Sequence, residues 1–182
     1  STVVEDLTDA NLALLREVAP TVTDPELRAR LADVIWTAKR DHKLAEIAVD
    51  SYLASAEELF DPEHWSRCAD RLERAMRLAL SLGRNAAPFS SVIDRIQDLV
   101  RRLDGEDPLF LSCRLMELLL ECDRGDVALC RALAGKAAAR AEQRTEWAIA
   151  RTYWELRARW DTRDGDQDSA RESALRAAET YV

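Results

Sequence analysis

The chain has 182 residues, a formal net charge of −8, and only 5 Gly and 5 Pro. This length suits one domain with a sizeable core, and the scarcity of turn residues beside abundant Ala, Leu, Arg and Glu disfavours an all-β fold. The acidic surplus disfavours bulk binding to nucleic acid or to an anionic membrane. Because the apolar runs are too short to span a bilayer and the N-terminus lacks a secretory pattern, we expect a cytoplasmic protein.

The cysteines occupy apolar positions of predicted helices, and none belongs to a C-x-x-C pair. A cytosolic setting keeps such thiols reduced, so we expect core residues rather than disulfides or metal ligands. They are Cys68, Cys113, Cys122 and Cys130.

The chain opens with a short amphipathic helix over residues 7–18, so that residues 1–22 form an N-terminal helix and linker. Thr23-Asp24-Pro25-Glu26 then predicts a strong helix start, with Thr23 and Glu26 as a capping box and Pro25 in the first turn. The following helix has two apolar faces, as expected for an inner member of a stack. One face carries Leu27, Leu31, Val34, Ile35 and Ala38, and the other Ala29, Ala32 and Trp36.

Later helix boundaries are also marked by capping residues. Asp61-Pro62 predicts a helix start with Asp61 as the N-cap, and Asp107-Pro108 repeats this device. Gly83 predicts a left-handed stop. Trp36, Trp65, Trp147 and Trp154 lie on the apolar stripes of their helices, so we expect them in the core.

The predicted turns recur along the chain. Asp41, Asp126 and Asp166 are each followed, one and two helical turns later, by apolar and mostly small side chains. The gap from Asp41 to Asp126 is close to twice the gap from Asp126 to Asp166, and Gly83 marks the missing turn between them. We therefore expect one helical-repeat domain over residues 1–182, with a period of about 42 residues. Its four antiparallel helix pairs would span 23–60, 61–104, 105–142 and 143–182.

The last pair carries Gly165-Asp166-x-x-x-Ala170-x-x-x-Ala174-x-x-Ala177. This string resembles the second half of a tetratricopeptide repeat, in which a turn precedes a helix with small residues at its packing positions. The resemblance implies an all-α, right-handed α-solenoid. The period departs from the usual ~34 residues, so we expect a divergent, tetratricopeptide-like array.

A second resemblance concerns the strings 30–36, 39–41 and 52–56. They are similar to the N-terminal part of an uncharacterised family of large bacterial proteins. That similarity implies a C-terminal region with a ribonuclease-like domain. Since the chain begins at Ser1 without Met, we expect a piece of a longer protein.

Catalytic and metal-binding groups are scarce in this sequence. His42 and His64 each sit in the first turn of a predicted helix beside a carboxylate, where a surface role is expected. The cluster from Asp164 to Asp168 resembles a calcium loop but has Leu175 at the twelfth position, where a glutamate is needed. We therefore predict no enzyme activity, no cofactor and no metal.

Two basic clusters are candidate interaction surfaces. The first lies on one helix face, with Asp70 and Glu73 beside it, so that a solvated face with internal ion pairs is the alternative to an anion site. The second surrounds Trp160, which is either buried against a following repeat or exposed as a binding hot spot. The candidate residues are Arg67, Arg71 and Arg74 in the first cluster, and Arg151, Arg157, Arg159, Trp160 and Arg163 in the second.

The helical repeat and the lack of a catalytic constellation predict a non-enzymatic scaffold. Its partner would be a protein, a peptide or another domain of the same polypeptide, while nucleic acid and membrane are not expected. The alternative is a regulatory or nucleic-acid-guiding segment of a larger enzyme whose chemistry lies beyond Val182.

Overall fold

The computed structural model describes residues 9–39, 42–84, 87–103 and 111–180, and this part of the chain contains helices and turns but no strand. Predictions that fall on Asp41 and on Asp107-Pro108 lie outside these ranges. The helices are α1 (Asp9–Val18), a 3₁₀ turn (Ala19–Thr21), α2 (Pro25–Lys39), α3 (His42–Glu58), α4 (Trp65–Leu82), α5 (Ala87–Leu103), α6 (Leu111–Glu121), α7 (Val127–Gln143), α8 (Trp147–Arg163) and α9 (Gln167–Glu179).

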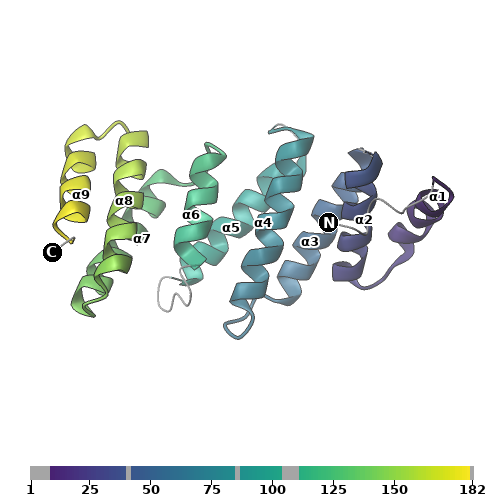
Figure 1. The fold of residues 1–182 in the computed structure, drawn as a ribbon, viewed down its shortest axis with the longest axis horizontal. Helices are drawn as coiled ribbons and strands as arrows, with labels where there is room; N and C mark the ends of the chain where they lie inside the picture. Colours follow the sequence, from purple (N-terminus) through teal and green to yellow (C-terminus); the bar gives the residue numbers. More distant parts are fainter. Residues whose placement is uncertain (1–8, 40–41, 85–86, 104–110, 181–182) are drawn as a thin grey trace. The chain divides into compact units, whose positions relative to one another are not determined.

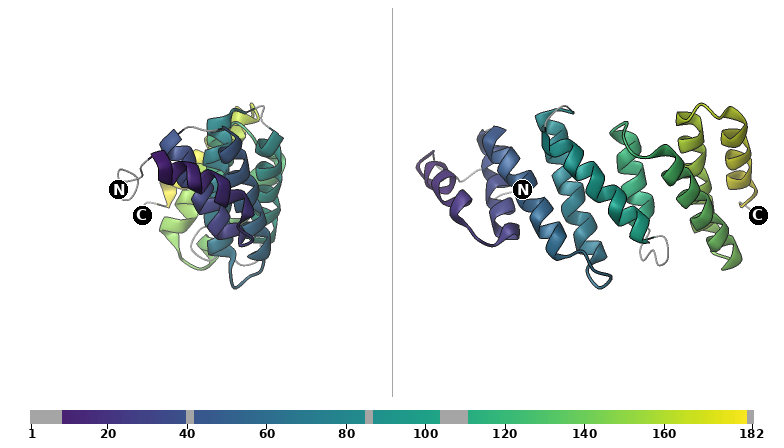
Figure 2. Two further views of the ribbon diagram at one scale, coloured as in Figure 1. Left: turned by 90° about the vertical axis from the view of Figure 1, so that its right-hand side faces the viewer. Right: turned by 180° about the vertical axis from the view of Figure 1, so that it is seen from behind.

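The chain divides into two compact units, Ser1–Ile96 and Gln97–Val182. In the first unit α3 packs against both α2 and α4, and in the second α8 packs against both α7 and α9 (Figures 1 and 2). These neighbours run antiparallel (Figure 1). The all-α class and the succession of helix pairs are thus confirmed, while a single domain over residues 1–182 and the handedness of the stacking stay predictions.

The start of α2 differs from the predicted capping box. The carboxylate of Asp24, not the Thr23 hydroxyl, accepts the backbone N–H of Leu27 at 2.9 Å, and Pro25 is the first helical residue. The prediction that Leu27 is buried is wrong: this residue of the first turn of α2 is 51% exposed. Deeper in α2, Ile35 and Trp36 are buried as predicted.

The start of α4 also differs from its prediction. Asp61 accepts the N–H of Glu63 at 3.0 Å, but this bond closes a turn, and the helix itself begins at Trp65. The Asp-Pro pair therefore shapes the turn instead of capping the helix. The break at Gly83 is present: this glycine has φ +110° and its N–H donates to the carbonyls of Ala79 and Leu80.

The second unit contains the repeated turn. Gly125 and Gly165 have φ +103° and +80°, which side chains rarely tolerate. The aspartates that follow cap α7 and α9, each accepting a backbone N–H three residues later at 3.0 Å. The two turns that the sequence pattern aligned therefore share their aspartate cap, whereas the residue that closes the preceding helix with a positive φ is Asp123 in the first and Gly165 in the second.

The small-residue stripe of α9 is narrower than predicted. Ala170 and Ala177 are buried together with Ser173, whereas Ala174 is exposed. A 100° step per residue places Ala174 beside Ser173 but turned away from α8.

Substitution of the two turn glycines separates backbone strain from packing. Gly165→Ala meets no atom within 4 Å and should cost about 1–2 kcal/mol through its positive φ alone. A Cβ at Gly125 would lie 3.1 Å from the Trp160 ring and 3.3 Å from Leu119. We therefore expect Gly125→Ala to lower the free energy of unfolding by at least about 1 kcal/mol more, measured by urea denaturation. Equal losses for the two variants would contradict this packing argument.

Candidate functional site

The basic cluster of the first unit is held within the chain. The guanidinium of Arg71 donates to Glu26 of α2 at 2.5 Å, and Arg67 lies 3.7 Å from the same carboxylate. The hydrogen bond from Arg71 lowers the pKa of Glu26, and Arg30 adds to this effect. The Arg71 side chain is only 9% exposed, so the solvated face of the sequence prediction is wrong at this position.

The third arginine of this cluster has a different set of partners. Tyr52 of α3 donates its hydroxyl to Asp33 of α2 at 3.2 Å. A hydrogen bond with Tyr52 raises the pKa of Arg74, and the nearby carboxylates of Asp33 and Asp70 add to it. Each of the three arginines thus has a carboxylate or a hydroxyl of the chain beside it, which favours internal ion pairs, while the anion site stays a prediction.

Trp160 is fully buried within this chain, so it is neither an exposed hot spot nor a side chain that a following repeat must cover. Its ring lies over Gly125, and the guanidinium of Arg163 lies 5.1 Å from the ring centroid. Arg163 also donates to the carbonyl of Arg124 at 2.6 Å and lies 3.3 Å from Asp123. Trp160 therefore anchors the α6–α7 turn and cannot meet a partner.

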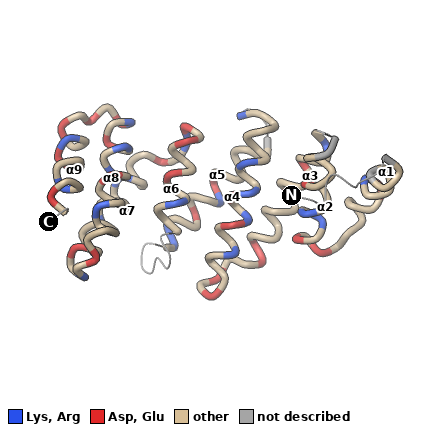
Figure 3. Tube along the Cα trace, viewed as in Figure 1, with Lys and Arg blue, Asp and Glu red and all other residues tan. Residues whose placement is uncertain are grey.

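The other candidate arginines of this cluster each have a local carboxylate. Arg151 donates to Glu155 at 2.7 Å within α8, and Arg159 donates to Glu117 of α6 at 3.1 Å. Arg157 lies 3.7 Å from Asp161 and 5.4 Å from the centroid of the Trp154 ring. Along α8 and α9 the arginines are interspersed with Asp and Glu (Figure 3), so the structure does not bring the predicted residues into one basic patch.

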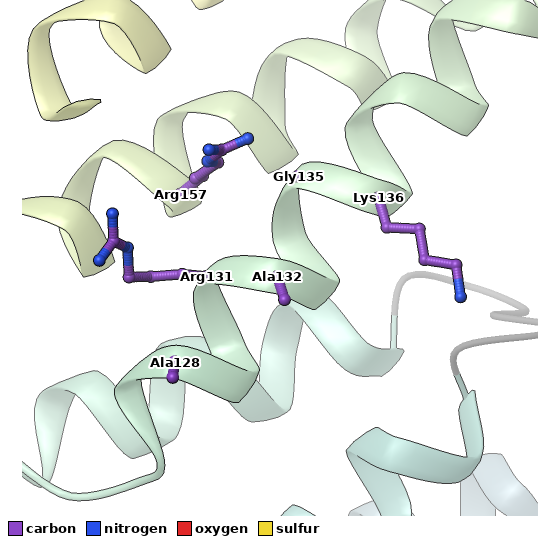
Figure 4. Close-up of a pocket in the computed structure, with 6 residues that line it drawn as sticks. All are labelled: Ala128, Arg131, Ala132, Gly135, Lys136 and Arg157. Carbon is purple, nitrogen blue, oxygen red and sulfur yellow. The ribbon is translucent and has the colours of Figure 1, made fainter.

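A groove of about 320 Å³ lies between α7 and α8 (Figure 4). Gly135 shapes it, because a Cβ there would lie 2.5 Å from Nη1 of Arg157. The absence of a side chain at Gly135 thus lets the guanidinium of Arg157 lie against α7. Lys136 points away from Arg131 and Arg157 (Figure 4). The lining residues are Ala128, Arg131, Ala132, Gly135, Lys136 and Arg157.

Arg131 pairs with two carboxylates of the acidic cluster that resembled a calcium loop. Its guanidinium donates to Asp161 at 2.6 Å and to Asp166 at 2.8 Å, and it also pairs with Asp164. The hydrogen bonds to Asp161 and Asp166 raise the pKa of Arg131. Asp161 is fully buried and accepts a further bond from Ser173 at 2.8 Å. Three carboxylates therefore meet two guanidinium groups, and the groove offers no surplus positive charge to an anion.

A second groove, of about 350 Å³, lies where α7 and α9 end beside the start of α8. We call it the Trp147 groove. It is lined by Glu142, Trp147, Arg176, Glu179 and Thr180.

Trp147 was expected in the core, but it is 51% exposed. It is the first residue of α8 and follows Thr145, which has φ +59°, so that the chain has just left the turn and neighbouring helices do not enclose the ring. The other four tryptophans are each at most 9% exposed. An apolar stripe on a helical wheel does not reveal this difference in exposure. The position of Trp147 directly after a predicted turn is the sequence signal that could have indicated its exposure.

Two residues that line the Trp147 groove, Glu142 and Arg176, have partners within the chain. The indole N–H of Trp154 donates to Glu142 at 2.7 Å. Arg176 lies 4.9 Å from the Trp154 ring centroid and 3.4 Å from Glu172. Glu179, in contrast, has no ion-pair partner among the residues that the structure describes. The groove thus combines two residues with internal partners, Glu142 and Arg176, with the exposed indole of Trp147 and the Glu179 carboxylate.

The histidines contact neighbouring side chains, and the cysteines are buried in the core. The His64 ring is bonded to Asp61 at 2.9 Å, and the His42 ring centroid lies 5.5 Å from that of Trp36. Burial raises the pKa of the Cys68 and Cys130 thiols to about 12, and all the cysteines are buried and free.

Within the described ranges, no three His, Cys, Asp or Glu side chains converge as metal ligands, and no helix is long and apolar enough to cross a membrane.

Comparison with known protein families gives a match in the first half of the chain. Residues 1–90 are similar to a family described as a domain of unknown function (DUF7380). No curated protein and no solved structure matches the chain. The family match covers most of the first unit and leaves the Trp147 groove outside it.

Removal of Arg131 should destabilise the second unit. Arg131→Met leaves the buried Asp161 with a weaker set of partners, and we expect a loss of about 2–4 kcal/mol in the free energy of unfolding. Arg159→Met, which breaks the exposed pair with Glu117, is the matched control and should cost less than about 1 kcal/mol. Denaturant titration of both variants measures the difference, and similar losses would show that Arg131 is merely another surface arginine.

The cap at Asp166 should make stability depend on pH in the acid range. The N–H of Ser169, its hydroxyl and Arg131 lower the pKa of Asp166. A lowered pKa gives stability that is complete above the unfolded value of about 3.9 and is lost as pH falls through the folded value. Asp166→Asn keeps an amide cap without the charge. The gap in thermal midpoint between the two proteins should therefore be largest above about pH 5 and shrink below about pH 4, and a constant gap would refute the assignment.

Proposed function

We propose that this chain is a non-enzymatic module that binds a protein or a peptide, and that the Trp147 groove is its contact site. The supporting observation is that Trp147, which is 51% exposed, lines a groove together with Glu142, whose carboxylate is hydrogen-bonded to Trp154. Binding energy in protein interfaces is concentrated in a few residues, with Trp and Arg enriched among them. Tryptophan also offers a large apolar surface with few rotatable bonds, so little conformational entropy is lost when a partner covers it.

The role is that of a cytoplasmic scaffold within a longer bacterial polypeptide, in which this chain presents one partner to another. Tetratricopeptide-like stacking of the helix pairs would extend the surface on either side of the groove. The nucleic-acid alternative gains no support from the arginines around Trp160, because each of them lies beside a carboxylate of the chain.

A capture experiment tests this function. Full-length chain immobilised on resin is incubated with nuclease-treated bacterial extract, and bound proteins are quantified by mass spectrometry. We expect a set of proteins that falls at least about tenfold with Trp147→Ala, as for a hot-spot residue. Leu175→Ala is the matched control, since Leu175 is 57% exposed on α9 and does not line the groove. An equal set for wild type and Trp147→Ala would overturn the proposed site.

A further inference from the structure

The geometry points to a Lys or Arg side chain of the partner polypeptide as the group that the Trp147 groove recognises, an inference that rests on the proposed function. The recognition would combine the exposed face of the Trp147 indole with the carboxylates of Glu142 and Glu179, which line the same groove.

The charges of the groove favour a cation. Its lining contains Glu142 and Glu179 against one cation, Arg176. Arg176 is engaged on both sides, by the Trp154 ring at 4.9 Å and by Glu172 at 3.4 Å. Glu179 has no such partner within the described part of the chain, so its charge remains available to an incoming group. The net charge of −8 adds a long-range attraction for basic segments.

The aromatic chemistry of the second unit favours the same occupant. Arg157 and Arg176 lie 5.4 and 4.9 Å from the centroid of the Trp154 ring, and Arg163 lies 5.1 Å from that of Trp160. These distances are within the range in which a cation is attracted by the negative face of an indole. No cation of the described residues pairs with Trp147, and this residue is 51% exposed, so its ring is accessible for the interaction that its neighbours already make.

Other occupants fit less well. An acidic segment would meet two carboxylates at a site whose one guanidinium is already paired, and like charges repel at such distances. A wholly apolar segment would cover the indole but would also remove the Glu179 carboxylate from water without a partner, which costs free energy. A basic side chain satisfies both groups, because its apolar stem and cationic head can lie along the ring.

Tripeptide titration of the full chain tests the inference without a known partner. The probes are acetyl-Gly-Arg-Gly-amide, acetyl-Gly-Lys-Gly-amide, and the Glu and Leu analogues. Each is followed through the tryptophan indole N–H signals in ¹⁵N-correlated spectra, and Trp147→Phe assigns the Trp147 signal. We expect saturable shifts of that signal with the Arg and Lys probes at millimolar concentration. The shifts should weaken at high salt, because screening reduces the attraction between exposed charges.

Variants then separate the two recognition elements. Glu179→Gln should raise the Kd for the Arg probe about threefold, the size of an exposed charge pair. Glu155→Gln, which removes a carboxylate paired with Arg151 elsewhere on α8, should leave it unchanged. Trp147→Ala should abolish saturable shifts of the Thr180 and Arg176 backbone amides. Equal or stronger shifts with the Glu or Leu probe, or none with the Arg and Lys probes, would overturn this inference, whereas the capture experiment judges the proposed function separately.

Discussion

The second unit depends on one buried carboxylate. Asp161 lies on the inner face of α8 with no exposed surface, and it accepts from Arg131 of α7 and Ser173 of α9. One side chain thus ties three helices together. An uncompensated charge at that depth would be costly, so the partners must stay in place. Arg131 also holds Asp166, the residue that caps α9. The packing of α8 and the start of α9 are therefore fixed by the same guanidinium.

The first unit uses the inverse arrangement. There a single carboxylate, that of Glu26, is met by three arginines, Arg30, Arg67 and Arg71. Both arrangements use arginine because its planar group reaches several oxygen atoms at once. They also account for the surface chemistry: charge that a sequence presents as a basic or acidic cluster is largely consumed inside each unit. Among the described residues, the Trp147 indole and the Glu179 carboxylate have no such internal ion-pair partner.

The local signals of this sequence predicted the helices well. The contacts of the candidate site were harder to predict, because long side chains reach partners that are distant in the sequence. Gly-Asp turns and the glycine at position 83 act through backbone geometry within a few residues, so their spacing located the helix pairs. Arg131, by contrast, reaches a carboxylate 30 residues away. Helical periodicity gives the direction of a side chain around its own axis, but not whether a neighbour covers it there. Trp147 and Trp160 both lie on α8, and only the position of adjacent helices makes one exposed and the other buried.

The close approach at Gly135 has a consequence for sequence variation. Arg157 occupies the space that any side chain at position 135 would need, since a Cβ there would lie 2.5 Å from its guanidinium. The residues at positions 135 and 157 are therefore expected to change together during evolution. A relative that acquires a larger residue at 135 must shorten or redirect the residue at 157, and a relative with a small residue at 157 is released from the need for glycine. Covariation between these two columns would trace the α7–α8 groove through a family even where the overall sequence has diverged.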